Sequence, residues 1–155
     1  MTKRNYCIEI NSNKTAKAMA KNLPISTKYA EEMSKILKGM HLAKAKAYLN
    51  RILKMEDFLP LRKYNKKVAH RKGNSKLGVK SGRYPQKVAQ AFLTLLDSVE
   101  ANAEFKDLDT EKLLITHIYS SQGYRRPKLQ PQGHIAGRRR FSKSTHLEVI
   151  VTEAA

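Results

Sequence analysis

The sequence predicts an α+β fold in which a small antiparallel sheet is covered by helices and a basic hairpin projects from the sheet. Three observations support this prediction. Several segments before residue 104 carry apolar residues at helical spacing, two segments near the C-terminus alternate apolar with polar residues, and the stretch between those two is long and basic. A chain of 155 residues, 41% of them hydrophobic, is large enough for one domain, residues 1–155, with a modest core.

The first predicted elements are a strand and a short helix. Apolar side chains alternate with others over residues 6–10, which is typical of a half-buried strand. The polar residues 11–13 can cap a helix. Over residues 14–23 small apolar side chains keep helical spacing as far as Pro24, and a helix is therefore predicted there.

Two further helices are predicted next. The first is capped by Ser26 or Thr27, and Gly39 is placed to end it. The second begins near Leu42, and its apolar stripe at helical spacing runs from Ala45 to Leu53. We expect these two helices to pack with the helix over residues 14–23.

A long irregular segment and a long helix follow. Residues 56–82 are predicted to be mostly loop, because proline and glycine interrupt any period there. Pro85 suits the first turn of a helix whose apolar face runs from Val88 to Ala103. This is the strongest amphipathic pattern in the chain, and it predicts the central helix of the core.

Two strands are predicted near the C-terminus, over residues 113–119 and 145–152, where β-branched and apolar residues occupy alternate positions. We expect them to pair antiparallel. The residues between them, 120–144, are too many and too basic for an ordinary turn. They are predicted to form a hairpin that projects from the sheet.

The excess positive charge is confined to two segments. The chain has 31 Lys and Arg against 13 Asp and Glu, a net charge of +18. Residues 58–96 hold ten of these cations and residues 112–147 hold eight, with no acid in either segment, so the rest of the chain is balanced. Solvated helix faces normally mix both signs. The pattern instead predicts a neutral body with two RNA-contacting extensions, the basic loop 58–84 and the hairpin extension 120–144.

Other classes of protein fit the sequence less well. The basic runs are interrupted by glycine and proline, unlike a membrane-surface helix with an apolar face opposite its lysines. The N-terminus lacks the apolar stretch of a secretory signal and no window is long enough to span a membrane, so an intracellular protein is predicted. Cys7 is the only cysteine, which excludes an internal disulfide and a Cys-rich zinc site. No cofactor or metal is expected.

Several short blocks occur in order along nearly the whole chain. They lie at 14–19, 39–49, 60–65, 70–73, 82–85, 95–104, 108–118 and 145–148, and one of them reads Gly82-Arg83-Tyr84-Pro85. Together they resemble the universal large-subunit ribosomal protein family numbered twenty-two in bacteria and archaea and seventeen in the eukaryotic cytosolic scheme, in particular its archaeal and eukaryotic branch. The chain departs from the family at the hairpin tip, 133–138, and at three single positions. Thr27 stands where the family usually has proline, Ser98 where it has asparagine and Asp107 where it has glycine.

The resemblance implies both a fold and a role. The fold is a three-stranded antiparallel sheet covered by helices, with a long protruding β-hairpin that lines the polypeptide exit tunnel. The role is that of a structural constituent of the large ribosomal subunit, which binds 23S/25S/28S-type rRNA and supports subunit assembly. The implied partners are rRNA, neighbouring large-subunit proteins and, transiently, the nascent polypeptide, with no membrane and no homo-oligomer. The implied location is the cytoplasm, with assembly in the nucleolus for a eukaryotic source, and no catalysis is implied.

The predicted RNA contacts are the cations of the two segments and the aromatic residues among them. Lys and Arg neutralise phosphates, and Arg138, Arg139 and Arg140 can also grip them bidentately from the return limb of the hairpin. Tyr64, Tyr124 and Phe141 can stack on bases, whereas Tyr84 either stacks or packs at a helix entry. The predicted RNA-binding residues are Arg62, Lys63, Tyr64, Lys66, Lys67, His70, Arg71, Lys72, Lys76, Lys80, Arg83, Lys87, Tyr124, Arg125, Arg126, Lys128, Arg138, Arg139, Arg140 and Lys143.

Two other functions are weighed against this one. A ribonuclease could use a histidine pair such as His117 and His146, which fall in strands predicted to pair, but no spacing in the chain matches a metal or nucleophile motif. The protein is therefore not predicted to be an enzyme. A free-standing RNA-binding or RNA-chaperone protein would show the same charge pattern. It would tolerate disordered basic tails, whereas a scaffold component needs a fixed shape.

Overall fold

The computed structural model describes residues 6–8, 10, 14–72 and 78–154. Its helices are α1 (Thr27–Leu37), α2 (Leu42–Leu53) and α3 (Gln86–Glu104), and a short 3-10 helix follows at Thr110–Lys112. Its strands are β1 (Thr15–Leu23), β2 (Leu59–Pro60), β3 (Gly82–Arg83), β4 (Leu113–Leu129) and β5 (Arg139–Glu153).

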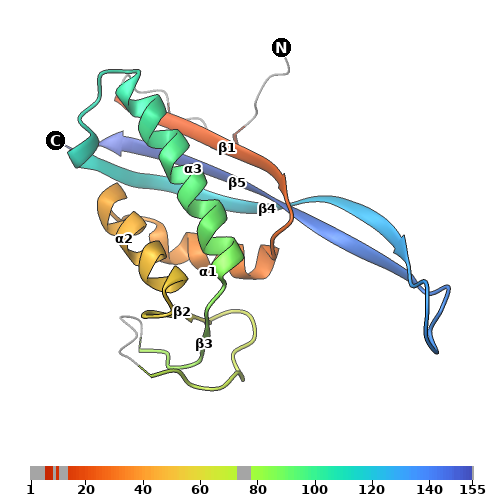
Figure 1. The fold of residues 1–155 in the computed structure, drawn as a ribbon. Coiled ribbons are helices and arrows are strands. Elements are labelled where there is room, and N and C mark those ends of the chain that lie inside the picture. The colour runs from red at the N-terminus through yellow and green to blue at the C-terminus, as the bar shows by residue number, and fades with distance from the viewer. Residues whose placement is uncertain (1–5, 9, 11–13, 73–77, 155) are drawn as a thin grey trace, which may run out of the picture.

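A three-stranded antiparallel sheet in the order β1-β5-β4 forms one layer, and α3 crosses one of its faces (Figure 1). α1 also contacts this sheet, and α2 packs against α3. The predicted α+β fold is thereby confirmed, including the antiparallel pairing of the two C-terminal strands. β2 and β3 form a separate short ladder, in which Leu59 pairs with Arg83 and Pro60 with Gly82.

The core lies between the sheet and the helices. Leu147, Val149 and Val151 alternate along β5 and are all 0% exposed, because alternate residues of a strand face the same side. Phe92 and Leu96, one helical turn apart on α3, are also 0% exposed. α3 is therefore the central core helix, as its amphipathic pattern predicted.

The helix boundaries largely follow the sequence signals. Gly39 has a φ of +80°, the left-handed conformation that glycine adopts readily, and it lies just beyond α1 as predicted. Pro85 occupies the position before the first residue of α3 and not its first turn. Asp107, where the resembling family usually has glycine, has a φ of 57° shortly after α3 ends.

The helix predicted over residues 14–23 is wrong, because this segment is the strand β1. Alanine favours helices by less than about 1 kcal/mol per residue over most other residues, and tertiary context overrides so weak a preference. Here β1 pairs with β5 from Thr15↔Thr152 to Leu23↔Thr145. The small Ala16 and Ala18 are buried beneath α3. The expected packing of three helices over residues 14–53 is therefore also wrong.

The strand predicted over residues 6–10 is wrong, because residues 6–8 and 10, the part of that range that the structure describes, are not in a strand. One edge of β1, where a further strand would pair, is occupied: Asn102 Nδ2 donates to the carbonyl of Lys17 at 2.9 Å, and Lys106 Nζ donates to the carbonyl of Thr15 at 2.8 Å. The N-terminal segment instead contacts β5, where the backbone N–H of Cys7 donates to the Glu148 carboxylate. The predicted cap at residues 11–13 lies outside the described residues.

Candidate nucleic-acid interface

β4 and β5 continue beyond the body of the sheet as a two-stranded hairpin arm, residues 120–144 (Figure 1). The ladder runs to Leu129↔Arg139, so the loop at the tip is reduced to residues 130–138. Residues 131–141 are all exposed. The predicted hairpin is confirmed, and it is a paired, extended structure along most of its length.

Like charges face each other across the hairpin arm. Arg125 lies opposite Lys143, and Lys128 lies opposite Arg140. Directly opposed like charges destabilise a strand pair, and the arm contains no acid that could compensate. The uncompensated charge of the arm therefore favours contact with a polyanion.

Both faces of the paired arm carry cations, and one of them also carries exposed apolar residues. Cross-strand partners project to the same face, so the pair Pro127↔Phe141 shares a face with Leu129↔Arg139, while Lys128↔Arg140 projects to the other face. Phe141 is 60% exposed and Leu129 is 67% exposed. One face thus combines these apolar residues with Arg125, Arg139 and Lys143, and the other face carries Arg126, Lys128 and Arg140.

The neck of the arm is tightly packed around Gly123. A β-bulge between Gln122 and Arg125 interrupts the ladder there. The Ser144 hydroxyl lies 2.8 Å from the carbonyl of Tyr124 and 3.1 Å from Oδ1 of Asn22, at the end of β1. A Cβ at Gly123 would lie 2.6 Å from Ser144 Oγ, closer than real contacts allow. Only glycine fits at this position without displacing the neck.

The basic loop, residues 58–84, is anchored to α1 by a buried carboxylate. Oε1 of Glu32, which is 1% exposed, accepts hydrogen bonds from the backbone N–H groups of Lys63 at 2.6 Å and Tyr64 at 2.9 Å. A buried carboxylate is costly unless its oxygens are hydrogen-bonded. Glu32 therefore fixes the start of the loop against the folded body.

A second carboxylate of α1 reinforces this anchor. Glu31 accepts from Lys63 Nζ at 2.7 Å and from the Tyr64 hydroxyl at 2.7 Å. These hydrogen bonds lower the pKa of Glu31 to about 2 and raise the pKa of Lys63 above its usual value. The Tyr64 ring also lies beneath the ammonium groups of Lys28 and Lys63, at 5.7 Å and 5.0 Å.

The far end of the basic loop closes around Arg71. Its backbone N–H donates to the carbonyl of Lys80 at 2.8 Å, and its Nε donates to the carbonyl of Gly82 at 3.2 Å. Its guanidinium lies 5.4 Å from the ring centre of Tyr84. Tyr84 is half-buried, so both of its predicted roles are compatible with its position.

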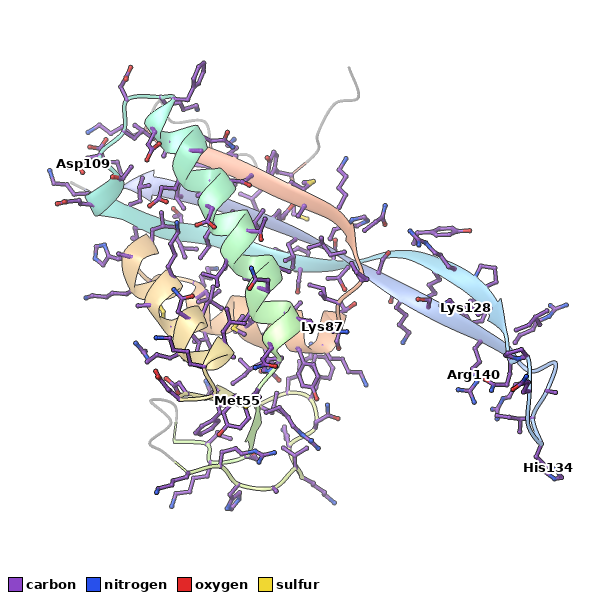
Figure 2. The ribbon with its side chains drawn as sticks, in the orientation of Figure 1. Met55, Lys87, Asp109, Lys128, His134 and Arg140 are labelled. Atoms are coloured by element: carbon purple, nitrogen blue, oxygen red, sulfur yellow. The ribbon has the colours of Figure 1, made fainter. Side chains whose placement is uncertain are left out.

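Most of the predicted RNA-binding residues are exposed in two surfaces, the hairpin arm and the basic loop with the start of α3. Figure 2 labels Lys128 and Arg140 on the arm and Lys87 at the start of α3. Tyr64 and Arg71 are half-buried, and Lys76 lies outside the described residues. Among the predicted residues that the structure describes, Lys63 alone forms an ion pair with a carboxylate. The other cations there are free of carboxylate partners and available to an external anion.

Sequence reasoning missed the residues that hold these two surfaces. Glu31 and Glu32 look like ordinary polar positions of a helix, and Asn22 looks like a turn residue. One signal is the place of Glu32 beside Met33 and close to the apolar face of α1. A carboxylate at such a position is buried only with a hydrogen-bonding partner, which indicates a contact with another segment.

The histidine pair considered for catalysis is not brought together as cross-strand partners. His117 lies opposite Ile150, and its Nε2 is 2.9 Å from Oε1 of the buried Glu148. His146 lies opposite Ser121. Within the part of the chain that the structure describes, no group of three His, Cys, Asp or Glu could hold a metal ion. No helix in that same part is long and apolar enough to cross a membrane.

Comparisons with known proteins give one consistent result. Residues 18–152 match the family model described as ribosomal protein L22p/L17e. The large ribosomal subunit protein uL22 of Ignicoccus hospitalis is 50% identical over 146 residues, which cover 94% of this chain and 92% of that protein. The protein of the same name from Methanocaldococcus jannaschii is 42% identical over 153 residues, covering 99% of this chain and 97% of that protein.

Proposed function

This chain belongs to the ribosomal protein L22p/L17e family, and from that membership we propose that it is built into the large ribosomal subunit by binding rRNA through its hairpin arm and its basic loop. It is a ribosomal structural protein and not an enzyme. Its proposed partners are large-subunit rRNA and the neighbouring proteins of that subunit. Its proposed location is the cytoplasm, where ribosomes work, and no membrane or homo-oligomer is part of the proposal.

The observation that carries the proposal is the uncompensated positive charge of the hairpin arm. The arm pairs cation with cation at Lys128↔Arg140 and at Arg125↔Lys143 and contains no acid. The phosphates of RNA supply the missing negative charge, and arginine side chains can bind them bidentately. Exposed aromatic and apolar residues beside the cations, such as Phe141, suit RNA because bases offer flat surfaces for stacking.

The finer part of the proposal concerns the direction of the arm. The body anchors the arm at its neck, and the paired strands can carry the tip at residues 130–138 well away from the sheet. We propose that the arm lines the polypeptide exit tunnel, with transient contact between the tip and the nascent polypeptide.

Incorporation into large subunits tests this function directly. A tagged copy of the full chain should sediment with large subunits, and Arg139→Ala together with Arg140→Ala should lower its occupancy there. The matched control is Lys21→Ala with Lys54→Ala, two exposed lysines outside both basic segments. Sedimentation of the wild-type chain mainly outside large-subunit fractions would favour the free RNA chaperone instead.

A further inference from the structure

A groove of about 640 Å³ lies between the end of α1 and one face of α2. The α2 wall is formed by Lys44, Ala47, Tyr48 and Arg51, whose spacing places them on one side of the helix. Lys46, on the opposite side of α2, pairs with Asp97 and Glu100 of α3. The groove therefore opens on the side of α2 away from α3, and most of its lining lies outside the two acid-free segments.

The floor of the groove is apolar and fixed in place. Ile36, Met40, Phe58 and Pro60 contribute to its lining. The Tyr48 hydroxyl donates to the carbonyl of Phe58 at 3.1 Å, and burial raises the pKa of Tyr48, so its ring stays neutral. The hydrogen bond thus fixes the Tyr48 ring as one wall of an apolar slot within the groove.

Two of the four Lys and Arg residues that line the groove have no carboxylate partner among the described residues. Lys35 is paired with Glu31, and Arg51 lies 3.6 Å from Asp57, the one acid in the lining. Lys38 and Lys44 are exposed, and neither has a carboxylate partner among the residues that the structure describes. They come from different elements, the connection after α1 and the helix α2.

The groove also adjoins the proposed RNA surface. Pro60, in its lining, belongs to β2, which lies inside the basic loop 58–84. Lys63, three residues further on, is fastened to α1 through Glu31 and Glu32. An RNA strand that follows the basic loop would therefore reach the groove without leaving the protein surface.

We propose that this groove binds an unpaired nucleobase of single-stranded RNA, with the base in the apolar slot and its flanking phosphates on Lys38 and Lys44. A nucleotide within an RNA strand has a flat base and a phosphate on each side of it. These features match an apolar slot bordered by lysines that have no carboxylate partner. The inference rests on the proposed RNA-bound function. It extends the RNA contacts to residues outside both acid-free segments.

A fluorescent base probe tests the groove in the free, full-length protein. The probe is a short single-stranded RNA with one central 2-aminopurine, whose emission reports the environment of that base. We expect the emission to change on binding and the change to be lost in Ala47→Leu, which fills the slot. Overall affinity should fall less than about threefold, since phosphate contacts dominate it. Ala43→Leu is the control, because Ala43 is exposed on the same helix outside the groove.

The charged rim is tested with the same probe. In the double variant Lys38→Glu with Lys44→Glu, the affinity measured from the emission change should be about tenfold lower. Lys54→Glu, at an exposed lysine beyond the groove, should leave it unchanged. An emission change that persists in Ala47→Leu, or that responds equally to Lys54→Glu, would overturn the proposal.

A photoreactive side chain at Ala47 identifies the occupant in assembled particles. We expect an adduct with an unpaired rRNA nucleotide, whereas an adduct with another protein, or none, would overturn the groove assignment. Failure of the chain to enter large subunits would contradict the proposed function instead. In that case the probe assay with free protein still decides whether the groove takes a base.

Discussion

The backbone N–H of Asn22 donates a hydrogen bond to Nδ1 of His146 at 3.0 Å, where β1 ends and the hairpin arm leaves the sheet. The side-chain oxygen of Asn22 accepts from the backbone N–H of Tyr124 at 3.3 Å and from the Ser144 hydroxyl at 3.1 Å. Asn22 therefore joins β1 to both strands of the arm. Its φ of 55° lies in the left-handed region, where asparagine is favoured over most side chains.

Replacing Asn22 with glycine should loosen the neck while leaving the backbone conformation accessible. The variant removes the acceptor for Tyr124 and Ser144, so the free energy of unfolding should fall by about 1 kcal/mol. Hydrogen exchange at the Tyr124 amide should become faster. Asn65→Gly is the control, because Asn65 has a similar φ of 54° in the basic loop. Equal effects of the two variants would contradict the role of the Asn22 side chain.

Gly123→Ala should disturb the same neck by steric overlap. The new Cβ would lie 2.6 Å from Ser144 Oγ and 2.8 Å from Asn22 Oδ1. Overpacking of this kind costs about 1–3 kcal/mol, measurable by chemical denaturation. Ser144→Ala removes one of the overlapping atoms, so the double variant should lose less stability than the two single variants added together. Strict additivity would mean that the overlap with Ser144 is not the cause.

The parts of this fold that could be predicted are those that local sequence patterns indicate. The apolar stripes of α1, α2 and α3 each span several turns, and the alternation in β4 and β5 marks both strands on its own. The basic segments of the candidate site were equally visible, because charge can be counted without a structure. No contact between distant residues was needed for any of these predictions.

The parts that could not be predicted depend on contacts between distant residues. β1 is a strand because β5 and α3 flank it, and its alanines alone favour a helix. The neck joins Asn22 to Ser144 across 122 positions of sequence. The anchor of the basic loop joins Glu32 to Lys63 across 31 positions. In each case the local sequence is compatible with several structures, and the tertiary contact selects one.

The anchor at Glu31 should be sensitive to acid. Its pKa falls from 4.5 to about 2 through hydrogen bonds with Lys63 and Tyr64, so the carboxylate stabilises the folded state above pH 4.5. That contribution should be lost as the pH falls through about 2. We expect Glu31→Gln to destabilise the protein near neutral pH and to approach wild-type stability at the lowest pH.

Denaturation curves at a series of pH values measure this difference. Glu104→Gln is the control, because Glu104 is an exposed carboxylate on α3 that forms no ion pair among the described residues. Its stability relative to wild type should change much less with pH. A difference for Glu31→Gln that stays constant down to the lowest pH would show that its ionisation does not hold the loop.

The opposed cations of the arm allow a final prediction in which stability and RNA affinity move in opposite directions. Lys128→Glu places a carboxylate opposite Arg140 and replaces repulsion with attraction, which should stabilise the free arm by roughly 0.2–1 kcal/mol. The same change removes a phosphate contact and adds a like charge to the RNA surface. Binding to rRNA fragments should weaken, and the dependence of log affinity on log salt should become shallower by about 1.

Lys128→Gln, which only removes the charge, should give intermediate values of both. Hydrogen exchange in the arm and filter binding over a salt series measure the two effects, and tighter RNA binding by the glutamate variant would mean that the arm does not face phosphates.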